Sequence, residues 1–103
     1  MNVISKKVYQ AFCRSHGRLS DEGFFDVWHK TCVHARWTCF ADVRTSLPKT
    51  DVPGNDRLIF DVRGNRYRIV VAVLYARPGG NGVLWIKWVG THSEYDKIAP
   101  LTI

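Results

Sequence analysis

Residues 57–75 read RLIFDVRGNRYRIVVAVLY and decide the fold of this chain. Two strand-like stretches, 57–62 and 66–75, flank Gly64-Asn65, a pair that favours a two-residue turn between antiparallel strands. The stretch therefore predicts a β-hairpin. The turn also sets the register of the hairpin, which places Asp61 opposite Arg68.

This register separates the side chains of the hairpin onto two faces, because side chains alternate along a strand. The apolar face should lie in the core and consists of Leu58, Phe60, Val62, Tyr67, Ile69, Val71 and Val73. The other face carries Asp61 with Arg57, Arg63, Arg66 and Arg68. Like charges opposite one another destabilise a sheet by up to about 1 kcal/mol per pair. We therefore expect this basic face to bind phosphates; the alternative is that its arginines are solvated and partly neutralised by Asp61.

Apolar residues at helical spacing predict three helices before the hairpin. The first should begin after a Ser5 cap and end at Gly17, burying Val8, Ala11 and Phe12. The second should begin after a Ser20 cap and bury Phe25, Trp28, Cys32 and Ala35. The third should begin near Thr38 and end at Pro48, with Phe40, Val43 and Leu47 on one stripe. Residues 49–56 are expected to form a loop.

Two more strands are predicted outside the hairpin, a short one at 2–4 and a last one at 83–89. In the last strand we expect Leu84, Ile86 and Trp88 to point inward, with Trp85 and Lys87 outward. The fold class is then α+β in one domain, residues 1–103: N-terminal helices packed on one face of a mostly antiparallel sheet of about four strands. Phe60, Ile69 and Val71 should face those helices.

The charge balance favours an anionic partner. Fifteen lysines and arginines against nine acidic residues give a net charge of +6 and a pI near 9.6. No apolar run approaches the ~20 residues that span a bilayer, and residues 1–4 are too short for the apolar region of a signal peptide. We therefore expect a cytoplasmic protein without a membrane partner.

The cysteines are expected to be reduced thiols. Cys13, Cys32 and Cys39 are an odd number in a chain without an export signal, which disfavours a disulfide framework. His29 and His34 lie near two of them, but this spacing matches none of the usual paired-ligand patterns of zinc sites. We therefore expect no metal site and no cofactor.

Residues 90–97, GTHSEYDK, are dense in titratable groups directly after the last predicted strand. Cleavage of RNA needs a base, an acid and a cation near one phosphate, and His92, Tyr95 and Lys97 are groups of these kinds. A structural role for His92 is the alternative. On the basic face, Trp85 could stack on a base or simply cover the sheet edge.

Several stretches together resemble one known family. They are VISKK at 3–7, ADV at 41–43, NDR at 55–57, FDV at 60–62, GNRYRIVV at 64–71 and VGTHSEYDKI at 89–98, and they resemble the HigB toxins of the RelE-like superfamily. The similarity covers nearly the whole chain. The combination of the GN-x-YR hairpin with the terminal GTH-x-EYDK is specific, whereas either motif alone is weak.

The resemblance implies a toxin of a toxin–antitoxin pair that cleaves mRNA, often on the ribosome, and that a HigA-type helix-turn-helix antitoxin neutralises. It also implies the RelE-like fold. Arg68 resembles the arginine that RelE-like enzymes direct at the scissile phosphate, and His92 and Tyr95 fall where related enzymes place acid, base or orienting groups. Lys87 and Lys97 are expected to add positive charge, and Arg57, Arg63, Arg66 and Trp85 to bind RNA.

The mechanistic hypothesis is metal-independent attack of a ribose 2′-hydroxyl on the adjacent phosphorus. Its principal rival is a non-catalytic RNA- or ribosome-binding module, which the basic face would serve equally well. A metal-dependent nuclease is disfavoured because Asp61 and Asp96 do not form an evident carboxylate cluster of the kind that holds magnesium.

Overall fold

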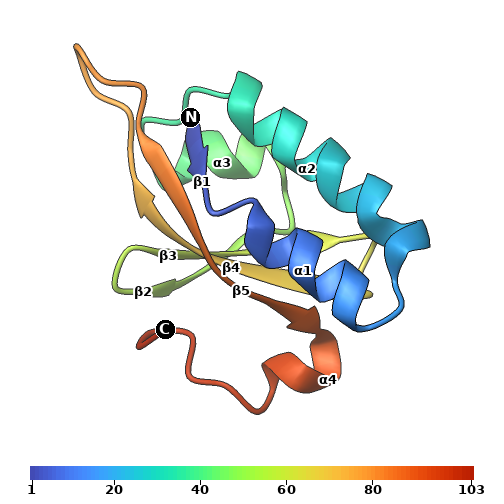
Figure 1. The fold of residues 1–103 in the computed structure, drawn as a ribbon. Coiled ribbons are helices and arrows are strands. Elements are labelled where there is room, and N and C mark those ends of the chain that lie inside the picture. Colours follow the sequence, from blue (N-terminus) through green and yellow to red (C-terminus); the bar gives the residue numbers. More distant parts are fainter.

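A computed structural model describes residues 1–103 and contains a five-stranded sheet with helices on both sides (Figure 1). The elements in chain order are β1 (Asn2–Ile4), α1 (Lys7–Ser15), a 3-10 turn (Leu19–Asp21), α2 (Glu22–His34), α3 (Phe40–Ser46), β2 (Asp51–Gly54), β3 (Arg57–Val62), β4 (Tyr67–Leu74), β5 (Val83–Thr91) and α4 (His92–Tyr95). The strand order is β1-β5-β4-β3-β2, in which β1 and β5 are parallel and the other pairs antiparallel. The predicted α+β fold is confirmed.

The predicted hairpin and its register are confirmed. β3 pairs with β4 so that Asp61 lies opposite Arg68, and the ladder ends at the pair Val62 and Tyr67. The seven side chains of the predicted apolar face are all buried. We call this side of the sheet the helix face, because α2 and α3 pack over it, and the opposite side the outer face (Figure 1).

The sheet has five strands rather than the predicted four, because residues 51–54 form β2 instead of belonging to a loop. β2 pairs with β3 through Asp51 and Ile59 and through Gly54 and Arg57, with an irregularity between the two pairs. The sequence of β2 is DVPG, which lacks alternating hydrophobicity and contains a proline. Proline is tolerated here because an edge strand needs hydrogen bonds on one side only.

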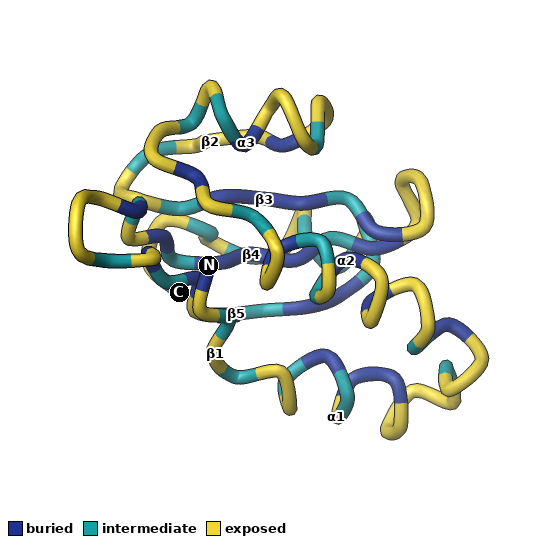
Figure 2. Tube along the Cα trace, turned by 90° about the horizontal axis from the view of Figure 1, so that it is seen from above, coloured by how far each residue is buried: buried dark blue, intermediate teal, exposed yellow.

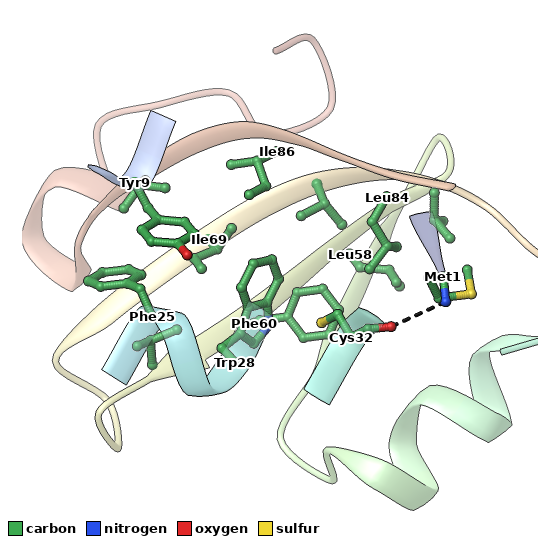
Figure 3. Close-up of a cluster of buried hydrophobic side chains, with 14 of the residues drawn as sticks. Met1, Tyr9, Phe25, Trp28, Cys32, Leu58, Phe60, Ile69, Leu84 and Ile86 are labelled. Carbon is green, nitrogen blue, oxygen red and sulfur yellow. Dashed lines mark hydrogen bonds between the residues drawn. The ribbon is translucent and has the colours of Figure 1, made fainter. Parts of the chain in front are cut away.

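The core lies between the helices and the helix face of the sheet, and Figure 3 shows part of it. Phe25, Trp28 and Cys32 of α2 are buried there, as predicted. On α1 the prediction was right for Phe12, which is buried, and Val8 packs against the core while partly buried. It was wrong for Ala11, which is exposed, and it missed the buried Tyr9 and Cys13. Tyr9 can be buried because its hydroxyl donates a hydrogen bond to the Asp26 carboxylate at 2.7 Å.

The predicted serine caps are also wrong. Ser5 lies in the left-handed region with a φ of 73°, and α1 begins at Lys7 without a side-chain cap. α2 begins at Glu22 after the 3-10 turn, rather than directly after Ser20.

At the end of α2, the amino group of Met1 donates to the Cys32 carbonyl at 3.3 Å (Figure 3). A positive charge at this helix end interacts favourably with the helix dipole.

A β-bulge in β5 changes which tryptophan faces the core. Val70 lies opposite Trp88 and Val71 opposite Ile86, so Lys87 is the extra residue. Leu84 and Ile86 are buried in the core as predicted, but the prediction that Trp88 also points inward is wrong. The bulge shifts the alternation by one residue, which turns Trp88 to the outer face.

The outer face is partly covered instead of fully solvated. α4 and the segment after it lie on this side (Figure 1), and the Arg57 guanidinium donates to the Ile103 carbonyl at 2.7 Å. Ile59 and Val70 are buried on this face although they are not part of the main core cluster. Figure 2 shows the resulting pattern, with buried residues along the central strands and exposed ones in the loops and on the helices. No helix in the structure combines the length and apolar character needed to cross a membrane.

The ring of Trp88 packs against Gly90. This contact allows a test of the placement of Trp88 on the outer face. A Cβ at position 90 would lie 2.5 Å from Cζ2 of Trp88, whereas no atom lies within 4 Å of a Cβ added at Gly23 in α2. We expect Gly90→Ala to destabilise the protein by about 1–3 kcal/mol through overpacking. Gly23→Ala should instead stabilise it by about 0.5–1 kcal/mol. Urea unfolding of both variants measures these changes, and equal effects would contradict the placement of Trp88.

Candidate active site

Arg68 is the centre of a cluster of polar and aromatic side chains on the outer face. Its Nε donates a hydrogen bond to His92 Nε2 at 3.2 Å and lies 3.4 Å from Asp61 Oδ1. The Arg68 guanidinium carbon lies 4.6 Å from the centroid of the Tyr95 ring, a cation–π contact. Three separate elements, β3, β4 and α4, therefore bring their side chains to one place.

Local structure explains why these residues meet. The β3–β4 register puts Asp61 opposite Arg68, and Thr91 at the end of β5 begins α4. Thr91 and Glu94 form a capping box: the Glu94 amide donates to Thr91 Oγ1 at 3.2 Å, and the Thr91 amide donates to Glu94 Oε1 at 2.9 Å. This cap turns the chain directly after the strand, so that His92 and Tyr95 come over the hairpin.

Trp88 holds Tyr95 from a second side. The two rings make an edge contact with 6.1 Å between centroids. Trp88 lies opposite Val70, and the Tyr95 ring lies against the Arg68 guanidinium, so the aromatic pair packs beside the cluster. Neither Asp61 nor Trp88 was among the predicted site residues. Asp61 could have been found from its place opposite Arg68, whereas Trp88 depends on the bulge.

Asp61 is shared between two partners. Its Oδ1 lies 3.4 Å from Arg68 Nε and 3.4 Å from His92 Nε2. The Arg68 and Asp61 side chains are only 21% and 18% exposed, so Arg68 is more buried than a surface arginine. None of the hydrogen bonds within the protein uses the Nη groups of Arg68, which leaves these donors for a ligand. A guanidinium with free donors in this position can bind an anion.

The Nε2 atom of His92 can interact with either of two neighbouring side chains, Arg68 or Asp61. Arg68 donates to this nitrogen, which makes it the acceptor in a neutral ring with the proton on Nδ1. A protonated ring would instead donate from Nε2 to Asp61. His92 is 36% exposed, so solvent can reach the imidazole. The His92 Nε2 therefore lies within reach of both a donor, Arg68, and an acceptor, Asp61.

The other predicted site residues make no hydrogen bond, ion pair or aromatic contact with this cluster. Lys87 is exposed at the bulge, and Lys97 is exposed after α4. Trp85 is 36% exposed and lies opposite Ala72, farther along the outer face. Arg57 donates to backbone carbonyls of Asn55 and Ile103.

Arg63 and Arg66 do not share the face of Arg68, so this part of the sequence prediction is wrong. Arg63 Nη1 donates to Asp21 Oδ1 at 2.9 Å, and Arg66 Nε lies 3.8 Å from Asp21 Oδ2. Asp21 immediately precedes α2, on the helix side of the sheet. The alternation of side chains ends with the ladder at Val62 and Tyr67, so the turn directs both arginines to the other side.

Metal-ligating residues are not clustered in this chain. No three His, Cys, Asp or Glu side chains are grouped so that they could hold a metal ion. Cys13 and Cys32 are buried, Cys39 is exposed, and all three are free thiols. Burial raises the pKa of the Cys13 thiol to about 11, which keeps it protonated and unreactive at neutral pH.

Comparison with known families gives the class of the protein. A family model for HigB_toxin, the RelE-like toxic component of a toxin–antitoxin system, matches residues 22–98. The chain belongs to the HigB toxin family. The matched region includes every residue of the Arg68 cluster. No curated protein matches the chain. As a member of the HigB family, this protein is the toxic component of a toxin–antitoxin system and has an antitoxin as its partner.

The capping box of α4 gives a pH-dependent test in this HigB-family toxin. The hydrogen bond from the Thr91 amide lowers the pKa of the Glu94 carboxyl below its ordinary value. A carboxyl whose pKa is lower in the folded protein than in the unfolded chain stabilises the fold at pH values above the unfolded pKa, which is about 4.3 for glutamate. This stabilisation is lost as the pH falls through the folded pKa. We expect Glu94→Ala to cost about 1 kcal/mol at neutral pH.

Urea unfolding at neutral and acidic pH measures this difference. The gap between wild type and Glu94→Ala should narrow once the pH falls below about 4. Asp96→Ala is the matched control, because Asp96 follows α4, is exposed and makes no side-chain hydrogen bond. A gap that stays the same at both pH values would contradict a charged cap at Glu94.

Proposed function

We propose that this HigB-family toxin is an endoribonuclease that cleaves mRNA without a metal ion and that the Arg68 cluster is its active site. The observation that supports this proposal most strongly is the convergence of Asp61, His92 and Tyr95 around Arg68. These side chains supply a cation, an imidazole and a phenol at one place. Phosphodiester cleavage needs a charge stabiliser and groups that accept and donate protons.

In the proposed reaction a ribose 2′-oxygen attacks the adjacent phosphorus. The bond from phosphorus to the 5′-oxygen of the next nucleotide breaks, and the products are a 2′,3′-cyclic phosphate and a 5′-hydroxyl. His92 and Tyr95 share the transfer of the proton from the 2′-hydroxyl and of the proton to the leaving 5′-oxygen. The free Nη donors of Arg68 stabilise the charge that develops on the phosphate. Lys87 and Lys97 add positive charge nearby.

The proposed partners follow from the same chemistry. The substrate is mRNA on the ribosome in the cytoplasm, and the net charge of +6 favours association with RNA. Arg57, Arg63, Arg66 and Trp85 are proposed to bind RNA outside the reacting phosphate. The antitoxin is proposed to be a HigA-type protein with a helix-turn-helix. A reading frame for such a protein beside that of the toxin would support this pairing.

Arg68 variants test the catalytic assignment. We expect Arg68→Ala to slow single-turnover cleavage of a ribosome-bound message by a factor of about 100 to 1,000, because the variant lacks a preorganised donor to the developing charge. Arg68→Lys should restore the rate only in part, since lysine lacks the planar, bidentate geometry of guanidinium. The alanine variant should also lose about 1–3 kcal/mol of stability, because Asp61 loses a charged partner in a half-buried site.

A thermal melt of each variant separates catalysis from folding. Arg77→Ala is the control, because Arg77 is exposed in the loop between β4 and β5 and its side chain makes no hydrogen bond or ion pair. Retained RNA binding without cleavage in Arg68→Ala and His92→Ala supports the enzyme. A wild-type protein that never cleaves, even on translating ribosomes, would instead be a non-catalytic RNA-binding module. Loss of cleavage on chelation, with the ribosomes intact, would contradict the metal-independent mechanism.

A further inference from the structure

A second basic cluster lies at the turn end of the hairpin, on the helix side. Arg63 Nη1 donates to both carboxylate oxygens of Asp21, at 2.9 and 3.0 Å, and Arg66 Nε donates to the Tyr67 hydroxyl at 3.3 Å. Arg18 Nη1 donates to the same hydroxyl at 3.0 Å, and Tyr67 in turn donates to Asp21. Three guanidiniums therefore gather around one carboxylate and one phenol.

The positive charge of this cluster exceeds what its structural contacts need. The Tyr67 hydrogen bond, together with Arg63 and Arg66, holds the pKa of Asp21 below its ordinary value, so this carboxylate stays charged. Glu94 is a second carboxylate near Arg18, so three guanidiniums face two carboxylates. The cluster thus keeps an excess of positive charge, whereas one arginine would suffice to neutralise Asp21.

Arg18 packs against two aromatic rings but keeps one donor without a partner. Its guanidinium carbon lies 5.4 Å from the centroid of the Tyr67 ring and 5.9 Å from that of Phe12. Its Nε is buried and has no hydrogen-bond partner. A buried N–H without a partner costs free energy, and neighbouring guanidiniums repel one another. A bound anion would offset this repulsion.

The cluster adjoins the candidate active site through the backbone. Tyr67 and Arg68 are neighbours on β4, and their side chains point to opposite faces of the sheet. Thr91, which lies opposite Tyr67, directly precedes His92. Both clusters therefore lie at the same end of the sheet, beside α4 (Figure 1). A polyanion bound at Arg68 would reach Arg18 and Arg66 by passing around this end.

We propose that Arg18, Arg63 and Arg66 form a second phosphate-binding subsite, which holds single-stranded RNA that continues from the Arg68 site around the end of the sheet. This inference rests on the proposed function. Asp21 and Tyr67 position the three guanidiniums, and Arg66, the most exposed of them with a 54% exposed side chain, leaves most of its donors free for phosphate oxygens. The subsite recognises backbone phosphates and carries no base preference.

The test measures binding of a labelled RNA of about ten nucleotides, a length within the range that single-strand binding modules cover. All its riboses carry 2′-O-methyl groups, which prevent attack by the 2′-oxygen, so affinity is measured apart from cleavage. We expect Arg18→Gln and Arg66→Gln each to weaken binding by roughly tenfold, the effect expected of removing one charge-assisted hydrogen bond. The slope of log affinity against log salt should fall in magnitude by about 0.7 for each phosphate that the variant no longer neutralises.

The matched control is Arg36→Gln, which removes the same charge from an exposed arginine whose side chain donates to the Arg77 carbonyl, away from both clusters. Its affinity should equal that of wild type. A 2′-O-methyl dinucleotide, which has one internucleotide phosphate, gives a second comparison. Its competition for the Arg68 site should be the same in wild type and in the two variants.

The outcomes separate the subsite from the proposed function. One outcome is that wild type cleaves mRNA but Arg18→Gln and Arg66→Gln bind the longer RNA as tightly as Arg36→Gln does. The proposal of a second subsite would then be wrong, whereas the proposed active site would be unaffected. Arg66 lies in the exposed turn, so Arg66→Gln carries the test if a thermal melt shows that Arg18→Gln does not fold. A wild type that binds neither RNA overturns both proposals. Equal weakening with the dinucleotide and the longer RNA would also contradict a separate subsite.

Discussion

The pairing of β3 with β4 is the constraint on which the rest of the structure depends. It places Asp61 opposite Arg68 on the outer face, while the residues on either side of them, such as Phe60, Tyr67 and Ile69, enter the core. A shift of one residue would exchange the two faces, which would bury the charges and expose the core. The burial of the apolar face therefore also holds the polar site in register. Stability and chemistry are set by the same hydrogen-bonded ladder.

The site adds a cap and a bulge to this ladder. The capping box at Thr91 and Glu94 brings His92 and Tyr95 over Arg68, and the bulge at Lys87 turns Trp88 outward to support Tyr95. Both devices act within the last strand and the helix that follows it. They surround a half-buried arginine whose Nη donors remain free. Donors held in place in this way can stabilise a negative charge that develops on a bound phosphate.

The sequence was sufficient to predict the hairpin, its register, the core face and the α+β class, because the Gly-Asn turn between two strand-like stretches fixes which residues pair. It was also sufficient to select Arg68, His92 and Tyr95, which the structure brings together. β2 was missed because DVPG has no strand pattern. The outward turn of Trp88 depends on a bulge, and the contact of Arg63 with Asp21 depends on where the ladder ends. These features arise from pairing between distant segments, which periodicity along one segment does not reveal.

The most direct test of the central claim, that the Arg68 cluster cleaves RNA by 2′-hydroxyl attack, is the chemical nature of the new RNA ends. Wild-type protein is added to translating ribosomes, and mass spectrometry identifies the termini of the cleaved message. The mechanism predicts a 2′,3′-cyclic phosphate and a 5′-hydroxyl with wild type, and about 100 to 1,000 times slower formation of these ends with a folded Arg68→Ala variant. A 5′-phosphate with a 3′-hydroxyl would show attack by water instead. That result, or unchanged cleavage by the variant, would contradict the assignment of the site.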